Sequence, residues 1–170
     1  MSSNTGGPRL SGQVRVHDVW SAALNGRDWI QKDDLNLSLI ISELANVSVL
    51  ERDGATYRFR LAGSAVRAEF EREARGACVD DIDDCRGSAA WSEGLSRSLQ
   101  MLKPVMGRTR TEDGMVHFWL RLPMSSDGET ADLVLCHDRF LPMEALTDPD
   151  RYARSADQMR RLDSNELQAA

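Results

Sequence analysis

The 170-residue sequence contains little lysine, cysteine or aromatic side chain. Only Lys32 and Lys103 are lysines, and the formal net charge is -6 at pH 7. Binding to a phosphate backbone needs a basic surface, so this composition argues against nucleic acid as a partner. The 3 cysteines are an odd number without CxxC spacing, which favours reduced thiols over a disulfide framework.

Long apolar runs are missing as well. No stretch approaches the roughly 20 apolar residues of a membrane-spanning helix. Residues 1–8 lack the basic and apolar regions of a signal peptide, so we expect a cytoplasmic protein. The length suits one domain, which we place at residues 14–142. It follows a polar, disordered leader at 1–13 and precedes a polar tail at 143–170, which is either frayed or begins with a short helix.

Patterns typical of catalytic or metal sites are absent from the sequence. His17, His117 and His137 lack the HxxE and HExxH spacings of metal sites. The acidic residues at 80–84 lack the glycine and the distant glutamate of a calcium loop, so we expect a solvated loop there. No nucleophile elbow or phosphate-binding loop occurs. We therefore predict no enzyme activity, no metal and no cofactor.

The clearest pattern is a hairpin formed by residues 115–122 and 132–137. Both segments are typical of strands, and Asp127-Gly128 between them suits a tight turn. This turn predicts that Leu122 lies opposite Leu133. One face of the sheet then carries Phe118, Leu120, Leu122, Leu133 and Leu135, and the other carries Trp119, Arg121, Val134 and Cys136. Since neither face is plainly polar, we expect both to be covered.

Helices and further strands surround this hairpin in the sequence. Apolar spacing predicts helices over residues 16–24, 37–44, 64–75 and from 88 to before Pro104. Strands are predicted at 47–51, 56–61 and 105–111, with the apolar residues of 56–61 on one buried face. Two strands, a helical crossover and three strands predict an α+β fold with a five-stranded antiparallel sheet, preceded by an amphipathic helix.

This order resembles a PAS domain, and several segments resemble the short, single-domain PAS family of alphaproteobacteria. The similar segments span residues 16–141: Trp20, Tyr-Arg-Phe-Arg-Leu-Ala-Gly at 57–63, Arg-Gly at 75–76, Lys-Pro-Val at 103–105 and Leu-Arg-Leu-Pro-Met-Ser-Ser-Asp-Gly at 120–128. The resemblance implies a signalling module. With no kinase, cyclase or DNA-binding segment, it is expected to act by binding a protein such as a sensor histidine kinase or another cell-cycle or motility regulator. The alternative is a sensor whose PAS cavity binds a small metabolite.

The resemblance also implies two sets of site residues. The expected ligand pocket beneath the helix of Trp91 is lined by Trp91, Leu95, Leu99, Met106, Phe118, Leu120, Leu133, Leu135 and His137, and the alternative is a filled core. The expected homodimer interface consists of Val16, Val19, Trp20, Ala23, Leu24, Trp119 and Val134, and the alternative is a helix packed only on its own domain. The Ala-Ala C-terminus is either a protease signal or a chance ending.

Overall fold

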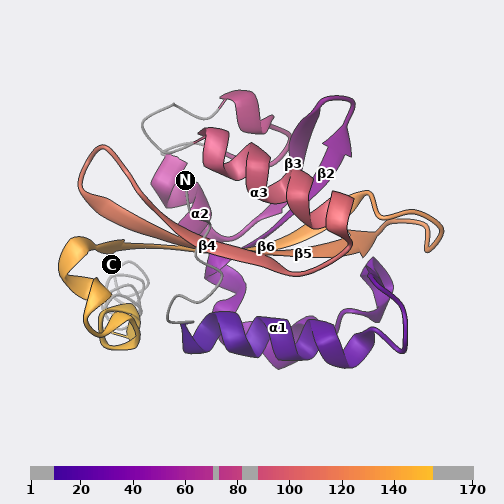
Figure 1. Ribbon diagram of the computed structural model, residues 1–170, viewed down its shortest axis with the longest axis horizontal. Coiled ribbons are helices and arrows are strands. Elements are labelled where there is room, and N and C mark those ends of the chain that lie inside the picture. The colour runs from indigo at the N-terminus through magenta and orange to yellow at the C-terminus, as the bar shows by residue number, and fades with distance from the viewer. Residues whose placement is uncertain (1–9, 71–72, 82–87, 155–170) are drawn as a thin grey trace, which may run out of the picture.

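A single sheet lies between two helical layers in the computed structural model, which describes residues 10–70, 73–81 and 88–154. Helix α1 (Ser11–Ala23) and the 3-10 segment η2 (Leu37–Asn46) pack on one face (Figure 1). Helices α2 (Ser64–Phe70) and α3 (Ser88–Met101) pack on the other. Among the described residues, no helix is long and apolar enough to cross a membrane.

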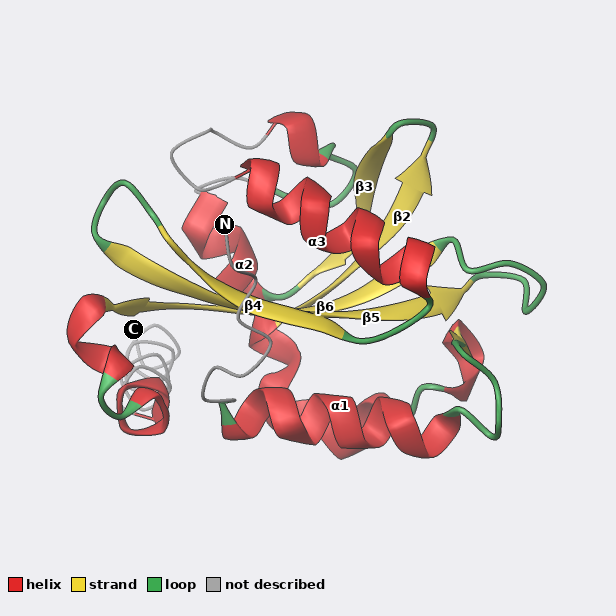
Figure 2. Cartoon of the chain, viewed as in Figure 1, coloured by secondary structure: helices red, strands yellow, loops and turns green. Residues whose placement is uncertain are grey.

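The five long strands form an antiparallel sheet in the order β3-β2-β6-β5-β4 (Figure 2). They are β2 (Val47–Asp53), β3 (Thr56–Ala62), β4 (Val105–Arg110), β5 (Met115–Ser125) and β6 (Leu133–Pro142). Helices α2 and α3 cross over between β3 and β4, which is the predicted PAS arrangement, so the fold prediction is confirmed. A two-residue strand, β1 (Ile30–Gln31), pairs in parallel with β5 and was not predicted, because two residues carry no periodic pattern.

The predicted register of the β5–β6 hairpin is wrong by two residues. Leu122 pairs with Leu135 instead of Leu133, because residues 126–132 form a wide loop in place of a two-residue turn. Two carboxylates stabilise this loop. Asp127 Oδ1 accepts hydrogen bonds from the Glu129 and Thr130 backbone N–H groups, at 2.8 and 3.1 Å, and the Asp132 carboxylate binds Ser126. A shift of two residues keeps every side chain on its predicted face.

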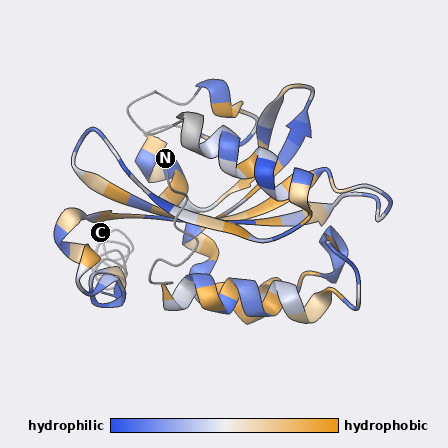
Figure 3. Cartoon of the chain, in the orientation of Figure 1, coloured by the Kyte–Doolittle hydropathy of each residue, from blue (hydrophilic) through white to orange (hydrophobic). Residues whose placement is uncertain are grey.

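The two faces of the sheet carry separate apolar clusters, and we name them after the helices that cover them. On the α3 face, Trp91, Leu95 and Leu99 pack with Val134 and Cys136. On the α1 face, Val16, Trp20 and Ile40 of the helical layer pack on Leu120, Leu122, Leu133 and Leu135. Figure 3 shows apolar segments along the central strands and recurring along α1. Both faces therefore contribute to the core.

Several predicted boundaries differ from the structure. Helix α1 begins at Ser11, and Leu10 is only 2% exposed, so the predicted leader is wrong over its last residues, and 1–9 lie outside the described residues. Helix α2 ends at Phe70, not at 75. Leu61 is 44% exposed, not buried, because a bulge opposite Val49/Leu50 reverses the alternation of β3. Residues 149–154 are helical, and the C-terminal Ala-Ala lies outside the described residues.

Candidate functional site

The predicted pocket residues lie on opposite faces of the sheet, so they do not line one pocket. Trp91, Leu95 and Leu99 are on the α3 face. The remaining candidates lie on the α1 face or at its end: Met106, Leu120, Leu133 and Leu135 pack with α1, Phe118 packs with Leu10, and His137 pairs with Leu120 in the ladder. Both faces are apolar, so periodicity gave no way to assign α3 to the correct one.

The predicted dimer interface is wrong for the same reason. Val16, Trp20 and Val134 are at most 3% exposed within a single chain, and Val19, Ala23 and Leu24 are partly buried against the apolar cluster of the α1 face. Trp119 lies on the opposite face, between α3 and β4. A Cβ atom on Gly107 would approach Trp119 Cε2 to 2.8 Å, so this glycine makes room for the indole. Homodimerisation itself remains a prediction.

The α3 face contains a buried ionic cluster in place of a purely apolar core. Asp138 Oδ1 accepts hydrogen bonds from Arg121 Nη2 at 2.8 Å and from His117 Nε2 at 2.6 Å. The three side chains come from neighbouring strands β5 and β6 and are each at most 2% exposed. We call them the inner cluster. Buried charges are tolerated only when they are paired, and Arg121 and Asp138 meet this condition.

Aromatic rings enclose the inner cluster. The His117 ring stacks on Phe140 at a centroid distance of 4.2 Å and on Trp91 at 5.5 Å. The Arg121 guanidinium carbon lies 4.3 Å from the centre of the Trp91 ring. Trp91 of α3 therefore covers Arg121 and His117, the two residues of the cluster that can carry a positive charge. Three buried polar atoms here, Trp91 Nε1, Arg121 Nε and Asp138 Oδ2, have no hydrogen-bond partner within the described part of the chain.

The inner cluster fixes its own protonation states. Burial opposes ionisation of Asp138, but the charge of Arg121 and the bonds from His117 and Arg121 outweigh it and hold the pKa of Asp138 below 3.8. Burial lowers the pKa of His117 below 6.5, with Asp138 opposing and Arg121 adding to the shift. Burial raises the pKa of the neighbouring Cys136 thiol to about 12, so this thiol is not an activated nucleophile.

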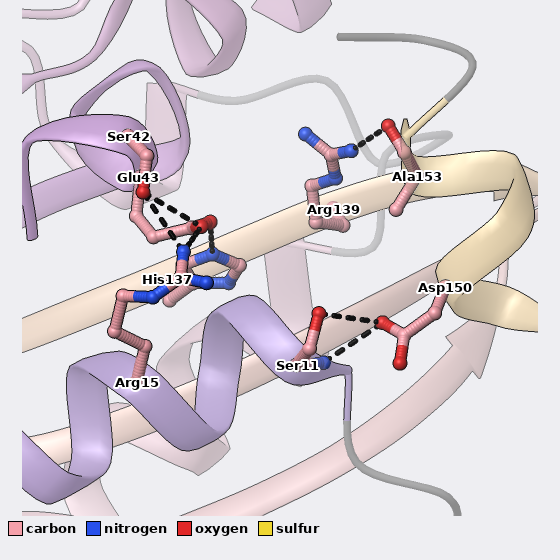
Figure 4. Close-up of polar contacts among 8 residues, drawn as sticks. All are labelled: Ser11, Arg15, Ser42, Glu43, His137, Arg139, Asp150 and Ala153. Carbon is pink, nitrogen blue, oxygen red and sulfur yellow. Dashed lines mark hydrogen bonds and ion pairs between the residues drawn. The ribbon is translucent and has the colours of Figure 1, made fainter.

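A second polar site lies on the α1 face and centres on Glu43 of η2 (Figure 4). Glu43 Oε1 accepts a hydrogen bond from Arg15 Nη1 of α1 at 2.6 Å, and Oε2 lies 3.1 Å from His137 Nε2 of β6. Gly12 of α1 leaves space for this carboxylate, since a Cβ there would lie 2.8 Å from Glu43 Cδ. One carboxylate thus joins α1, η2 and the sheet.

The start of α1 is held at a further point. Ser11 donates from its backbone N–H to Asp150 Oδ1 at 2.8 Å and from its hydroxyl at 3.0 Å (Figure 4). Arg139 Nη2 donates to the Ala153 carbonyl at 2.5 Å. The helical residues 149–154 are thereby tied both to α1 and to β6. Sequence patterns gave no signal for these long-range contacts, because each residue alone looks like an ordinary surface polar group.

We expect Glu43→Gln to loosen α1 from the sheet. The hydrogen bond from His137 is the largest cause of the lowered pKa of Glu43, and Arg15 and Arg139 act in the same direction against burial. Glu43→Gln removes the negative charge, and hydrogen bonds to a charged group each contribute about 1.5–3 kcal/mol to stability. Amide hydrogen exchange in α1 should then become about tenfold faster at pH 7, because tenfold corresponds to about 1.4 kcal/mol.

The pH dependence checks the same group. A lowered carboxyl pKa gives stability that is fully present above 4.5 and is lost as the pH falls through the lowered pKa. Acidification should therefore make α1 of the wild type exchange like that of the Gln variant. Glu51→Gln is the matched control, since Glu51 pairs with Arg60 at 2.6 Å on β2 and β3, away from α1. Equal exchange of α1 in wild type and Glu43→Gln would contradict the assignment.

Segment η2 also presents an exposed apolar row next to Glu43. Leu37, Leu39 and Ile41 are 43%, 59% and 71% exposed, and we call them the η2 row. The row is anchored: Ile40 between them is fully buried, and Asn36 Oδ1 caps the segment by accepting from the Ser38 N–H at 3.1 Å. The sequence predicted an apolar helix here, but not that its outer side remains uncovered.

Metal-binding residues do not gather at either site. Over residues 10–70, 73–81 and 88–154, no three histidine, cysteine or carboxylate side chains form a cluster suited to a metal ion. Cys78 and Cys136 are free thiols. Of the acidic residues at 80–84, Asp81 accepts a hydrogen bond from the Cys78 backbone N–H at 3.1 Å, and the last three residues lie outside the described part.

Comparisons with known proteins find similarity only among solved structures. No protein family and no curated protein matches the sequence. A domain of an HTR-like protein from Haloarcula marismortui ATCC 43049 aligns with a TM-score of 0.47 and 10% identity, over 55% of this chain and 94% of that one. An RNA-binding light-oxygen-voltage receptor aligns with a TM-score of 0.44 and 14% identity, over 97% of this chain and 42% of that one. Neither similarity bears on the function of this chain.

Proposed function

We propose that this PAS-fold chain is a signalling module that acts by binding other proteins, and that the η2 row is its contact surface. The supporting observation is the exposure of Leu37, Leu39 and Ile41 on an anchored segment. Exposed aliphatic side chains that gather on a folded domain mark interaction sites, and these three lie within five consecutive residues. The family resemblance suggests as partners a sensor histidine kinase or another cell-cycle or motility regulator, and a second copy of the chain. A cytoplasmic location remains a prediction.

The interior favours binding of proteins over binding of metabolites. Beneath α3, Trp91 contacts Phe59 and Phe70 at ring-centroid distances of 5.7 and 5.8 Å, and it also covers His117 and Arg121. These ring contacts beneath α3 support the filled-core alternative to a pocket. The metabolite-sensor alternative keeps one observation in its favour, which is that Trp91 Nε1, Arg121 Nε and Asp138 Oδ2 have no hydrogen-bond partner within the described residues.

A photo-crosslinking amino acid placed at position 41 tests this proposal in cells of the source organism. We expect discrete covalent adducts, and we expect Leu39→Asp in the same chain to reduce their yield about tenfold, because a charge in an apolar contact is costly to desolvate. The matched control places the same amino acid at Leu61, which is 44% exposed on β3. An adduct with twice the mass of the chain identifies a second copy, and other masses identify a partner.

Two outcomes would overturn the proposal. One is that position 41 gives no adduct that position 61 lacks. The other is a stoichiometric small-molecule mass in native mass spectrometry of freshly purified protein, which would favour the metabolite sensor.

A further inference from the structure

The outer edge of β4 is an unpaired strand edge. Among the described residues, β4 pairs only with β5, from Val105↔Arg121 to Arg110↔Val116. The Thr111 N–H donates to the Met115 carbonyl at 3.0 Å, which makes Thr111 and Met115 a hydrogen-bonded pair of this ladder. Such pairs alternate along an antiparallel ladder. Met106, Arg108 and Arg110 therefore turn their backbone N–H and C=O groups away from β5.

This edge is held in a fixed conformation. Trp119 of β5 packs against the backbone of Gly107, and its Nε1 donates to Thr109 Oγ1 at 3.2 Å. Both contacts come from the α3 face, so they leave the outward backbone groups free. A strand edge fixed in this way loses little conformational entropy when another strand pairs with it.

The edge also carries two cations without partners. Arg108 and Arg110 are exposed, and within the part of the chain that the structure describes neither forms an ion pair or a hydrogen bond through its side chain. They are two residues apart, so both project on the same side of the strand. An unpaired basic pair is notable in a chain with a net charge of -6.

We propose that the β4 edge binds an extended acidic segment of a partner protein as an added antiparallel strand. Backbone bonds to Met106, Arg108 and Arg110 supply the pairing, and carboxylates at alternate positions of the partner lie opposite Arg108 and Arg110. A second copy of β4 fits less well in the two registers centred on the arginines. A two-fold axis at Arg108 places this arginine opposite itself, and an axis at Thr109 places Arg108 opposite Arg110, and like charges opposite each other destabilise a strand pair.

This inference rests on the proposed function only in assigning the chain to protein recognition. It uses a different surface from the η2 row and a different assay, so either proposal fails without the other. The probe is a synthetic peptide in which glutamate alternates with threonine, and its matched control has lysine in place of glutamate. Binding is measured by fluorescence anisotropy on the full chain at low and moderate salt, because exposed charge pairs are screened.

We expect the acidic peptide to bind and the basic one not to bind. Arg108→Glu together with Arg110→Glu should weaken acidic-peptide binding about tenfold or more and allow the lysine peptide to bind. Arg52→Glu with Arg60→Glu on β2 and β3 is the matched charge control, and it should weaken acidic-peptide binding less than the Arg108 and Arg110 reversal does. Arg110→Pro removes one outward N–H at an edge position that tolerates proline, and it should also abolish binding.

Residue-resolved hydrogen exchange separates strand addition from simple charge attraction. On peptide binding, the amides of Met106, Arg108 and Arg110 should become protected, while those of Gly107 and Thr109, already bonded to β5, should not change. Loss of binding in the charge reversal without this alternating protection would overturn strand addition. Two results would show that the chain itself, and not an acidic partner, covers the β4 edge. One is protection of the three amides in the free monomer, and the other is a dimer that Arg110→Pro dissociates.

Discussion

Asp138→Ala should lower the free energy of unfolding by about 3–5 kcal/mol, the range seen when one partner of a buried ion pair is removed. Arg121 is fully buried, and its Nη2 donates a hydrogen bond to Asp138 Oδ1 at 2.8 Å, which pairs the two charges. Its other bond within the described chain is from Nη1 to the Leu120 carbonyl at 2.9 Å, which does not neutralise the guanidinium. The variant therefore retains a buried, unpaired cation. Urea unfolding followed by far-UV circular dichroism measures the loss.

A double variant separates charge from packing. Arg121→Met with Asp138→Leu removes both charges and keeps apolar volume, and buried ion pairs replaced in this way are often neutral or more stable. We expect the double variant to recover most of the stability that Asp138→Ala loses. If Asp138→Ala alone lowers the free energy of unfolding by less than about 1 kcal/mol, which is the value of an exposed pair, the inner cluster does not contain a buried ion pair of Arg121 and Asp138.

Gly63→Ala should lower the free energy of unfolding by about 2–3 kcal/mol, near the upper part of the range for overpacking. Gly63 lies between β3 and α2, directly against η2. A Cβ atom there would lie 2.6 Å from the Ala45 carbonyl carbon, which is backbone and has no rotamer to change. The Gly63 N–H also donates to the Val47 carbonyl at 2.8 Å, which limits movement of its own backbone.

The direction of this effect is diagnostic. Replacing glycine by alanine normally stabilises a protein slightly, by about 0.4–1 kcal/mol, through the unfolded state. A loss of stability in Gly63→Ala therefore shows that the added methyl group clashes with the η2 backbone. Because η2 carries the η2 row, crosslinking from position 41 should fall together with stability. Ala62→Gly is the neighbouring control and should leave crosslinking unchanged. A Gly63→Ala protein as stable as the wild type would show that η2 moves aside at no cost.

The sequence determined the five long strands and, except beyond the bulge of β3, the side of the sheet on which their residues lie. Alternation along β5 and β6 assigned Leu120 and Trp119 to opposite faces, and the assignment holds although the register is shifted by two residues. Gly54 of the β2–β3 turn and Pro104 after α3 set element ends for local reasons, since both act through backbone dihedral angles. The order of helices and strands along the chain, and with it the α+β class, follows from these elements.

Tertiary structure decided which helix covers which face and where the strands end. Both faces of the sheet are apolar, so no feature of the sequence assigned α1 to the face that carries Leu120. Strand β6 was predicted to end at His137, before the charged Asp138 and Arg139. It continues to Pro142 because Arg121 and His117 bind Asp138, and the Ala153 carbonyl accepts from Arg139. Contacts across the fold, invisible to local periodicity, make those charges compatible with burial.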